Sequence, residues 1–258
     1  MFQTKYPIFQ KGRILKIEML EAMRELPLSF MKGSFSGYEN GILHGFDCLI
    51  DEGKLMIQPG LLKVNEQILI LDKEVEIPYF ASDNQLILKI ASPKATENQD
   101  MFLQEAVIEL TDQKQLGKNE WELIRFKLKP GAYLRKEYQG FEDLITEYNT
   151  VNPIYQTISL YGQKAISPPM MQLFCDYLQE FNSQHPLDQN FCLQILQSHG
   201  IVGEKALYYY LYQRLQQEID VSDAQHVHAQ LNSILIEVKN NRYRKAVEVR
   251  KNRKLIVD

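Results

Sequence analysis

The sequence predicts an α+β protein, with a β-rich antiparallel N-terminal domain (a sandwich or an open barrel) followed by a C-terminal helical bundle. Up to about residue 134, short apolar runs alternate with polar residues between turn residues, which is typical of strands. After residue 166, apolar residues recur with helical spacing. We therefore predict a β-rich domain over 1–134 with an N-terminal helix, a packed junction over 135–166 and a helical domain over 167–258.

The first domain is expected to begin with one helix. Residues Ile14 to Leu26 place apolar side chains along one stripe, and Pro27 is expected to end it. The strands expected after it cover residues 55–64 (broken at Pro59-Gly60), 67–71, 74–77, 85–90, 106–110 and 121–128. The alternation in the last of these is typical of a strand with one face in water.

Four helices are expected in the second domain. Ser167, followed by two prolines, is typical of a helix start, and Asp188 is expected to cap a second helix that ends at Gly200. Gly203 precedes a third helix, and Ser222 begins a fourth that continues to about residue 250. Amphipathic helices with short connections predict a small bundle.

Composition and motifs exclude several function classes. The 258 residues carry a net charge of −4, 45% are hydrophobic, and there is no apolar run of signal-peptide or membrane-spanning length, so we expect a soluble cytoplasmic protein. There is no phosphate-binding glycine loop and no dinucleotide fingerprint. His226 and His228 are two residues apart and point to different helix faces, so neither a metal nor a cofactor is expected.

The remaining chemical candidates are isolated residues. His44 and Cys48 would face the same side if their segment were one strand, and a Cys–His pair is one possible catalytic arrangement. The simpler interpretation is a turn residue beside an inert core cysteine. We predict no catalytic residue, and an enzyme with a non-local site stays a third hypothesis.

Two surface features favour contacts with other molecules. The run from Tyr208 to Tyr212 holds more tyrosine than one core can bury, so Tyr208, Tyr209 and Tyr212 are interface candidates. The C-terminal segment holds eight basic residues and the single acid Glu248. These basic patch candidates are Lys239, Arg242, Arg244, Lys245, Arg250, Lys251, Arg253 and Lys254. They would contact nucleic acid, an acidic partner or a neighbouring copy, or remain in solvent.

One segment resembles a known kind of module. From Tyr38 to Leu71, glycines at 41 and 45, the Pro59-Gly60 turn and a polar turn at Asn65 separate short apolar strands. The pattern, over about residues 37–80, resembles β-rich modules of phage tail-fibre and baseplate proteins. This resemblance implies an attachment or joining part, frequently within a symmetric oligomer.

These observations together predict a non-enzymatic structural or adaptor component of a phage tail or phage-tail-like contractile particle, with a baseplate or fibre-joining role. Its expected partners are other protein subunits, in a homo-oligomer or larger assembly, and not a membrane. An edge strand offers unpaired backbone groups to such partners. The alternative is a nucleic-acid-associated protein that uses the basic C-terminal segment.

Overall fold

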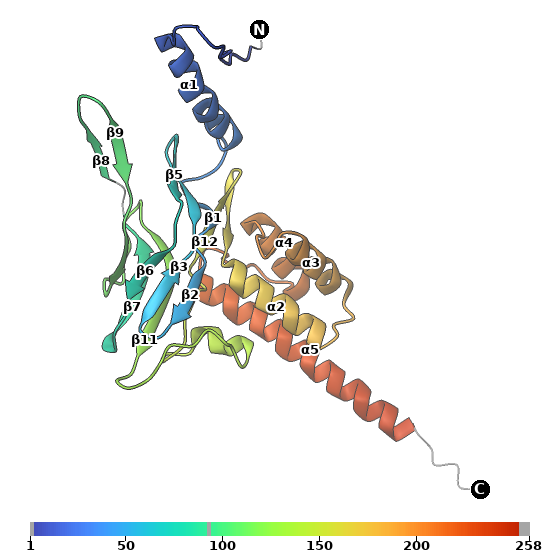
Figure 1. Cartoon of the computed structure of the whole chain (residues 1–258). Coiled ribbons are helices and arrows are strands. Elements are labelled where there is room, and N and C mark those ends of the chain that lie inside the picture. The colour runs from blue at the N-terminus through green and yellow to red at the C-terminus, as the bar shows by residue number, and fades with distance from the viewer. Residues whose placement is uncertain (1–2, 92–93, 253–258) are drawn as a thin grey trace.

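The protein contains both sheets and helices, in agreement with the α+β prediction. The structure is a computed structural model that describes residues 3–91 and 94–252, without the side chains of Asp83 and of residues 242–252. Figure 1 shows the strands gathered on one side and helices α2 to α5 on the other, while α1 stands off beyond the strands. The boundaries of the three segments drawn from the sequence stay a prediction.

The strands are short, and most lie where the sequence placed them. The bounds are β1 (Gly41–Gly45), β2 (Cys48–Asp51), β3 (Lys54–Ile57), β4 (Gly60–Val64), β5 (Gln67–Leu71), β6 (Val75–Pro78), β7 (Ser82–Ile90), β8 (Lys94–Glu97), β9 (Phe102–Glu105), β10 (Ile108–Thr111), β11 (Trp121–Leu128), β12 (Thr157–Leu160) and β13 (Gln163–Ile166). The strand ranges expected from the sequence did not include β1, β2, β8, β9, β12 or β13, although the tail-module resemblance implied short strands around β1 and β2.

The strands of the described residues form four sheets, and none of them closes into a barrel. The largest has the order β13-β12-β1-β4-β5, and the others are β10-β7-β11, β2-β3-β6 and the hairpin β8-β9. All pairings are antiparallel except β1 with β12, where Ile42 lies opposite Ile158 in a parallel pair. The predicted antiparallel character therefore has one exception, which joins the start of the first sheet to a strand more than a hundred residues later.

The turn residues behind the tail-module resemblance lie where the backbone requires them. Gly45 has φ +78°, and a Cβ there would lie 2.2 Å from the carbonyl oxygen of Pro59. A Cβ on Gly60 would lie 2.5 Å from the ring of Phe46. Asn65, which stands where the module usually has a glycine or asparagine turn, has φ +56° between β4 and β5. Only residues that tolerate these positions can keep β1, β4 and β5 in register.

The prediction that β11 has one wet face is wrong. All eight residues from Trp121 to Leu128 are buried or half-buried. Arg125 donates from Nε to Oε1 of Glu122 over 2.6 Å, and its guanidinium lies 3.4 Å from the centroid of the Tyr155 ring. The polar positions of the strand are thus satisfied by an internal ion pair and a cation–π contact in place of water.

The first helix also differs from the prediction. Helix α1 covers Ile17–Ser34 and continues past Pro27, which was expected to end it. Proline removes one backbone hydrogen bond, but its fixed φ is close to the helical value, so a helix can continue beyond it at a cost of about 3 kcal/mol.

The helical half agrees with the prediction in its four helices and in two of its starts. The bounds are α2 (Pro168–Glu180), α3 (Pro186–Gln197), α4 (Glu204–Leu215) and α5 (Ala224–Asn252). The Oγ of Ser167 accepts a hydrogen bond from the amide of Met170, as a helix cap does. Asp188 is not the cap of α3, because that helix begins two residues earlier and Nδ1 of His185 accepts from the amide of Leu187.

Two hydrophobic clusters form the interior. One joins the strands and includes the single tryptophan, Trp121, while the other joins the four helices of the bundle. Residues between 135 and 166 contribute to both, since Phe141 and Leu144 of the short 3-10 helix η1 (Phe141–Ile145) pack on the helices and Ile158 packs on the strands.

Candidate protein-contact surface

Helix α1 presents an apolar face that is largely exposed, with Met19 its one half-buried residue. Met19, Met23, Leu26 and Phe30 follow the spacing i, i+4, i+7 and i+11, so they share one side of the helix. No residue of α1 is buried, and Phe30 keeps 73% of its surface exposed. We name these four side chains the α1 apolar face.

The attachment of α1 to the body is slight. Lys32 at its C-terminal end forms an ion pair of 3.3 Å with Glu66, in the turn between β4 and β5, and both side chains are exposed. Exposed ion pairs contribute about 0–1 kcal/mol. An 18-residue helix with an internal proline is marginal in water without tertiary packing. The α1 apolar face would therefore be stabilised if another molecule covered it.

The β8-β9 hairpin is a second element that projects from the body, on the same side as α1 in the view of Figure 1. It forms a sheet of its own, and Met101, Phe102 and Leu103 at and beside its turn are exposed. Asn98 shapes this turn, because its Oδ1 accepts hydrogen bonds from the amides of Asp100 and Met101. That asparagine between two short runs is the signal that could have predicted the hairpin.

The predicted tyrosine candidates lie partly in solvent. Tyr209 of α4 is 62% exposed, and Tyr208 and Tyr212 are near 40% and stack on one another with ring centroids 5.9 Å apart. Tyr210, between them, is buried and stacks on Phe191 at 4.0 Å. One tyrosine of the run thus serves the core, and a role of the other three in an interface stays a prediction.

The basic segment lies only partly within the described residues. Lys239 is exposed, and its ammonium group lies 5.5 Å from the centroid of the Phe181 ring. The side chains of Arg242, Arg244, Lys245, Arg250 and Lys251 lie outside the described part, although the backbone there is helical. Arg253 and Lys254 lie outside it altogether. Binding of nucleic acid by this segment stays a prediction.

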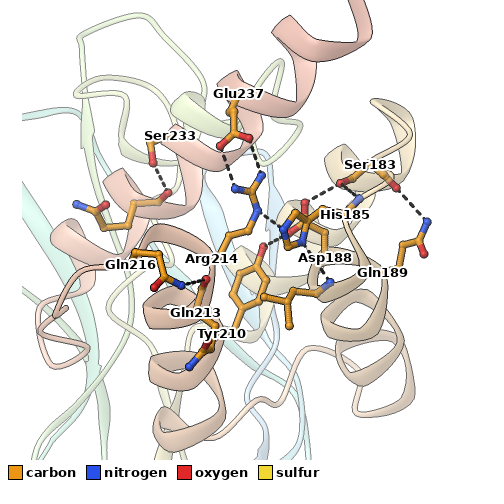
Figure 2. A network of polar contacts seen from close by, with 12 residues as sticks. Ser183, His185, Asp188, Gln189, Tyr210, Gln213, Arg214, Gln216, Ser233 and Glu237 are labelled. Carbon is orange, nitrogen blue, oxygen red and sulfur yellow. Dashed lines mark hydrogen bonds and ion pairs between the residues drawn. The ribbon is translucent and has the colours of Figure 1, made fainter. Parts of the chain in front are cut away.

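The helical bundle contains a buried polar network, which the sequence reading missed (Figure 2). Asp188 is fully buried and accepts hydrogen bonds from Ser183 Oγ at 2.6 Å, Tyr210 OH at 2.9 Å and Arg214 Nε at 3.1 Å. Arg214 also donates from both terminal nitrogens to the carboxylate of Glu237 on α5. No sequence signal could have predicted it, because Tyr210 and Arg214 are 22 and 26 residues from Asp188.

The network links α3, α4 and α5 through hydrogen bonds and ion pairs. Burial, followed by the charge of Asp188, raises the pKa of Tyr210 well above its usual value, so this phenol stays protonated and donates. Both oxygens of Asp188 accept from neighbouring side chains, Oδ2 from Ser183 and Oδ1 from Tyr210 and Arg214. Asp188 also lines a cavity of about 380 Å³ between α2 and α3, together with Cys192 and Leu178.

His44 and Cys48 do not form a pair of the kind that a strand would allow. His44 lies on β1 and is exposed, whereas Cys48 lies on β2 of a different sheet and is buried. Phe46 between them has φ +61°, which breaks the strand. Burial raises the pKa of the Cys48 thiol to about 12, so the thiolate nucleophile is scarce at neutral pH.

The described residues hold no cluster of three or more His, Cys, Asp or Glu side chains with the geometry of a metal site. His228 is buried, stacks on Phe141 and hydrogen-bonds the carbonyl oxygen of that residue over 2.9 Å. Among the helices in the described part of the chain, none has the length and apolar character required to cross a membrane.

Comparison with known proteins yields only distant structural likeness. Models of known protein families and curated proteins give no match. A crystal structure of TssK aligns with 92% of this chain and 69% of its own, at 8% sequence identity and a TM-score of 0.37. The resemblance is remote and assigns no family to the chain.

Proposed function

We propose that this chain is a non-enzymatic structural component of a phage tail or of a phage-tail-like contractile particle, in its baseplate or fibre-joining region. The observation that carries the proposal is the largely exposed α1 apolar face on a helix that stands off from the body. In a monomeric protein an exposed apolar face of this kind adds no stability, whereas in a joining part it can bind in an apolar groove on the partner.

The strand region gives further support. Residues 37–80, which resemble tail-fibre and baseplate modules, form six of the short strands, and Gly45, Gly60 and Asn65 take the backbone positions that the pattern needs. The buried carboxylate Asp188 is satisfied by its own neighbours, and the thiol of Cys48 is buried and protonated. Both features fit a part that works by contact.

The test is incorporation into particles. The tagged chain is expressed in its native host cell, and particles that contain a tail sheath are isolated by sedimentation. The amount of the chain in the particle fraction is then measured. We expect the wild-type chain to sediment with the particles, and the double variant Met23→Glu, Leu26→Glu to be reduced there at least about ten-fold because two charges would have to be buried. Glu21→Lys, on the opposite face of α1, is the matched control and should be retained.

Two results would count against the proposal. A wild-type chain that never sediments with sheath-containing particles contradicts the structural role. A double variant that is retained as well as Glu21→Lys contradicts the assignment of α1 as the contact. Salt-dependent binding to a labelled duplex that is lost on truncation after Val238 would favour the nucleic-acid alternative.

A further inference from the structure

Two of the three cysteines meet inside the helical bundle. Cys175 lies on α2 and Cys192 on α3, and both are buried with free thiols. Each thiol points at the backbone of the other residue, since Sγ of Cys175 lies 3.7 Å from the carbonyl oxygen of Cys192 and Sγ of Cys192 lies 3.9 Å from that of Cys175. The two side chains are also in contact with one another. This reciprocal arrangement brings two sulfur atoms together across one helix–helix contact.

The surroundings provide a route to one of the sulfurs. Cys192 lines the cavity of about 380 Å³ between α2 and α3, with Gln179 and Leu196 among the other lining residues. Cys175 is fully buried behind it, and the side-chain nitrogen Nε2 of Gln179 donates to its Sγ over 3.1 Å. A small oxidant that enters the cavity therefore meets Cys192 first, with a second thiol in reach of the product.

We propose that Cys175 and Cys192 are a disulfide-forming pair that a small hydroperoxide oxidises, which joins α2 to α3 covalently. The Cys192 thiolate attacks one oxygen of hydrogen peroxide, the O–O bond breaks, and a sulfenic acid and hydroxide form. The Cys175 sulfur then attacks the sulfenic sulfur, so that the S–S bond forms and the S–O bond breaks. Two thiols and one peroxide give one disulfide and two waters, and two equivalents of a small thiol reduce that disulfide by exchange and are themselves oxidised to a disulfide.

The reaction is expected to be slow. Burial, followed by the hydrogen bond to Cys175, raises the pKa of Cys192, so only a small fraction is thiolate at neutral pH. Cys48 belongs to the strand cluster and has no cysteine neighbour among the described residues, so it is a built-in reference thiol with a similarly raised pKa. Selective oxidation of the pair beside an intact Cys48 would thus report proximity and not general reactivity.

The test uses the purified full-length chain, treated with excess hydrogen peroxide and then denatured for thiol counting. We expect titratable thiols to fall from three to one, the peptides that contain Cys175 and Cys192 to be linked, and dithiothreitol to restore all three thiols. Cys48→Ser should still lose two thiols, whereas Cys192→Ser should keep both of those that remain. Because the bond closes a loop of 17 residues, the oxidised chain should unfold roughly 6–12 °C higher than the reduced chain.

Three results would overturn the proposal. They are survival of all three thiols in the wild-type chain, conversion of Cys192 to sulfinic acid without a link to Cys175, and an oxidised chain that is no more stable than the reduced one. The wild-type measurement decides the question even if a variant fails to fold. The disulfide proposal is independent of the proposed role in a particle, because neither cysteine belongs to α1.

Discussion

Replacing Asp188 with Asn is expected to lower the free energy of unfolding by about 3–5 kcal/mol. Asn keeps the size of the side chain but has one acceptor oxygen, and it brings two N–H donors to a point where three donors already converge. Asp188 is fully buried and the side chain of Arg214 is 7% exposed, so the bonds are lost at a site with little contact with solvent. Tyr210→Phe removes one of the three bonds and is expected to cost about 1–2 kcal/mol.

The assay is urea unfolding followed by two signals. Far-UV circular dichroism reports the helices, and the fluorescence of Trp121, the single tryptophan, reports the strand cluster. We expect Asp188→Asn to move the dichroism transition to lower urea by more than twice the shift of Tyr210→Phe. If Asp188→Asn costs less than about 1 kcal/mol, or no more than Tyr210→Phe, the account of the network as a stabilising anchor of the bundle is refuted.

Three further predictions concern caps, turns and pH. Ser167→Ala should cost about 1 kcal/mol in urea unfolding through loss of the α2 cap. Gly45→Ala should cost at least about 2 kcal/mol because of its positive φ and its backbone clash, whereas Gly131→Ala, with the same sign of φ but open space, should cost less. Burial lowers the pKa of His228 in the folded chain, so on acidification the unfolded chain takes up the proton first. The contribution of the neutral imidazole to stability is therefore complete above about pH 6.5 and is lost as the pH falls toward the lower folded pKa. His228→Phe should make the urea midpoint less dependent on pH over that range.

Local signals predicted much of the fold. The Pro59-Gly60 break, the run from Gln67 to Leu71 and the Ser167 cap depend on residues that are neighbours in sequence, and the structure has β4, β5 and α2 at these places. The continuation of α1 through Pro27 was not predicted, because proline only disfavours the helix interior and does not forbid it.

Long-range effects could not be predicted in this way. The parallel pairing of β1 with β12 places Ile42 opposite Ile158, and no pattern among neighbouring residues in the sequence predicts this pairing. The burial of β11 on both faces depends on the ion pair between Glu122 and Arg125. Both residues can be read from the sequence, but the exclusion of water from the pair is a result of the tertiary structure. The contact surface was likewise predicted only in part, because an amphipathic stripe does not reveal whether its own chain will cover it.

The central claim is that α1 is built to be covered by another protein chain, and hydrogen exchange of its backbone amides tests it most directly. In the isolated chain, the amides of residues 17–34 should exchange at least about ten-fold faster than those of the buried half of α5, since no residue of α1 is buried. In sheath-containing particles, the same amides should become protected. Slow exchange of α1 in the isolated chain, or no gain of protection in the particles, would contradict the account.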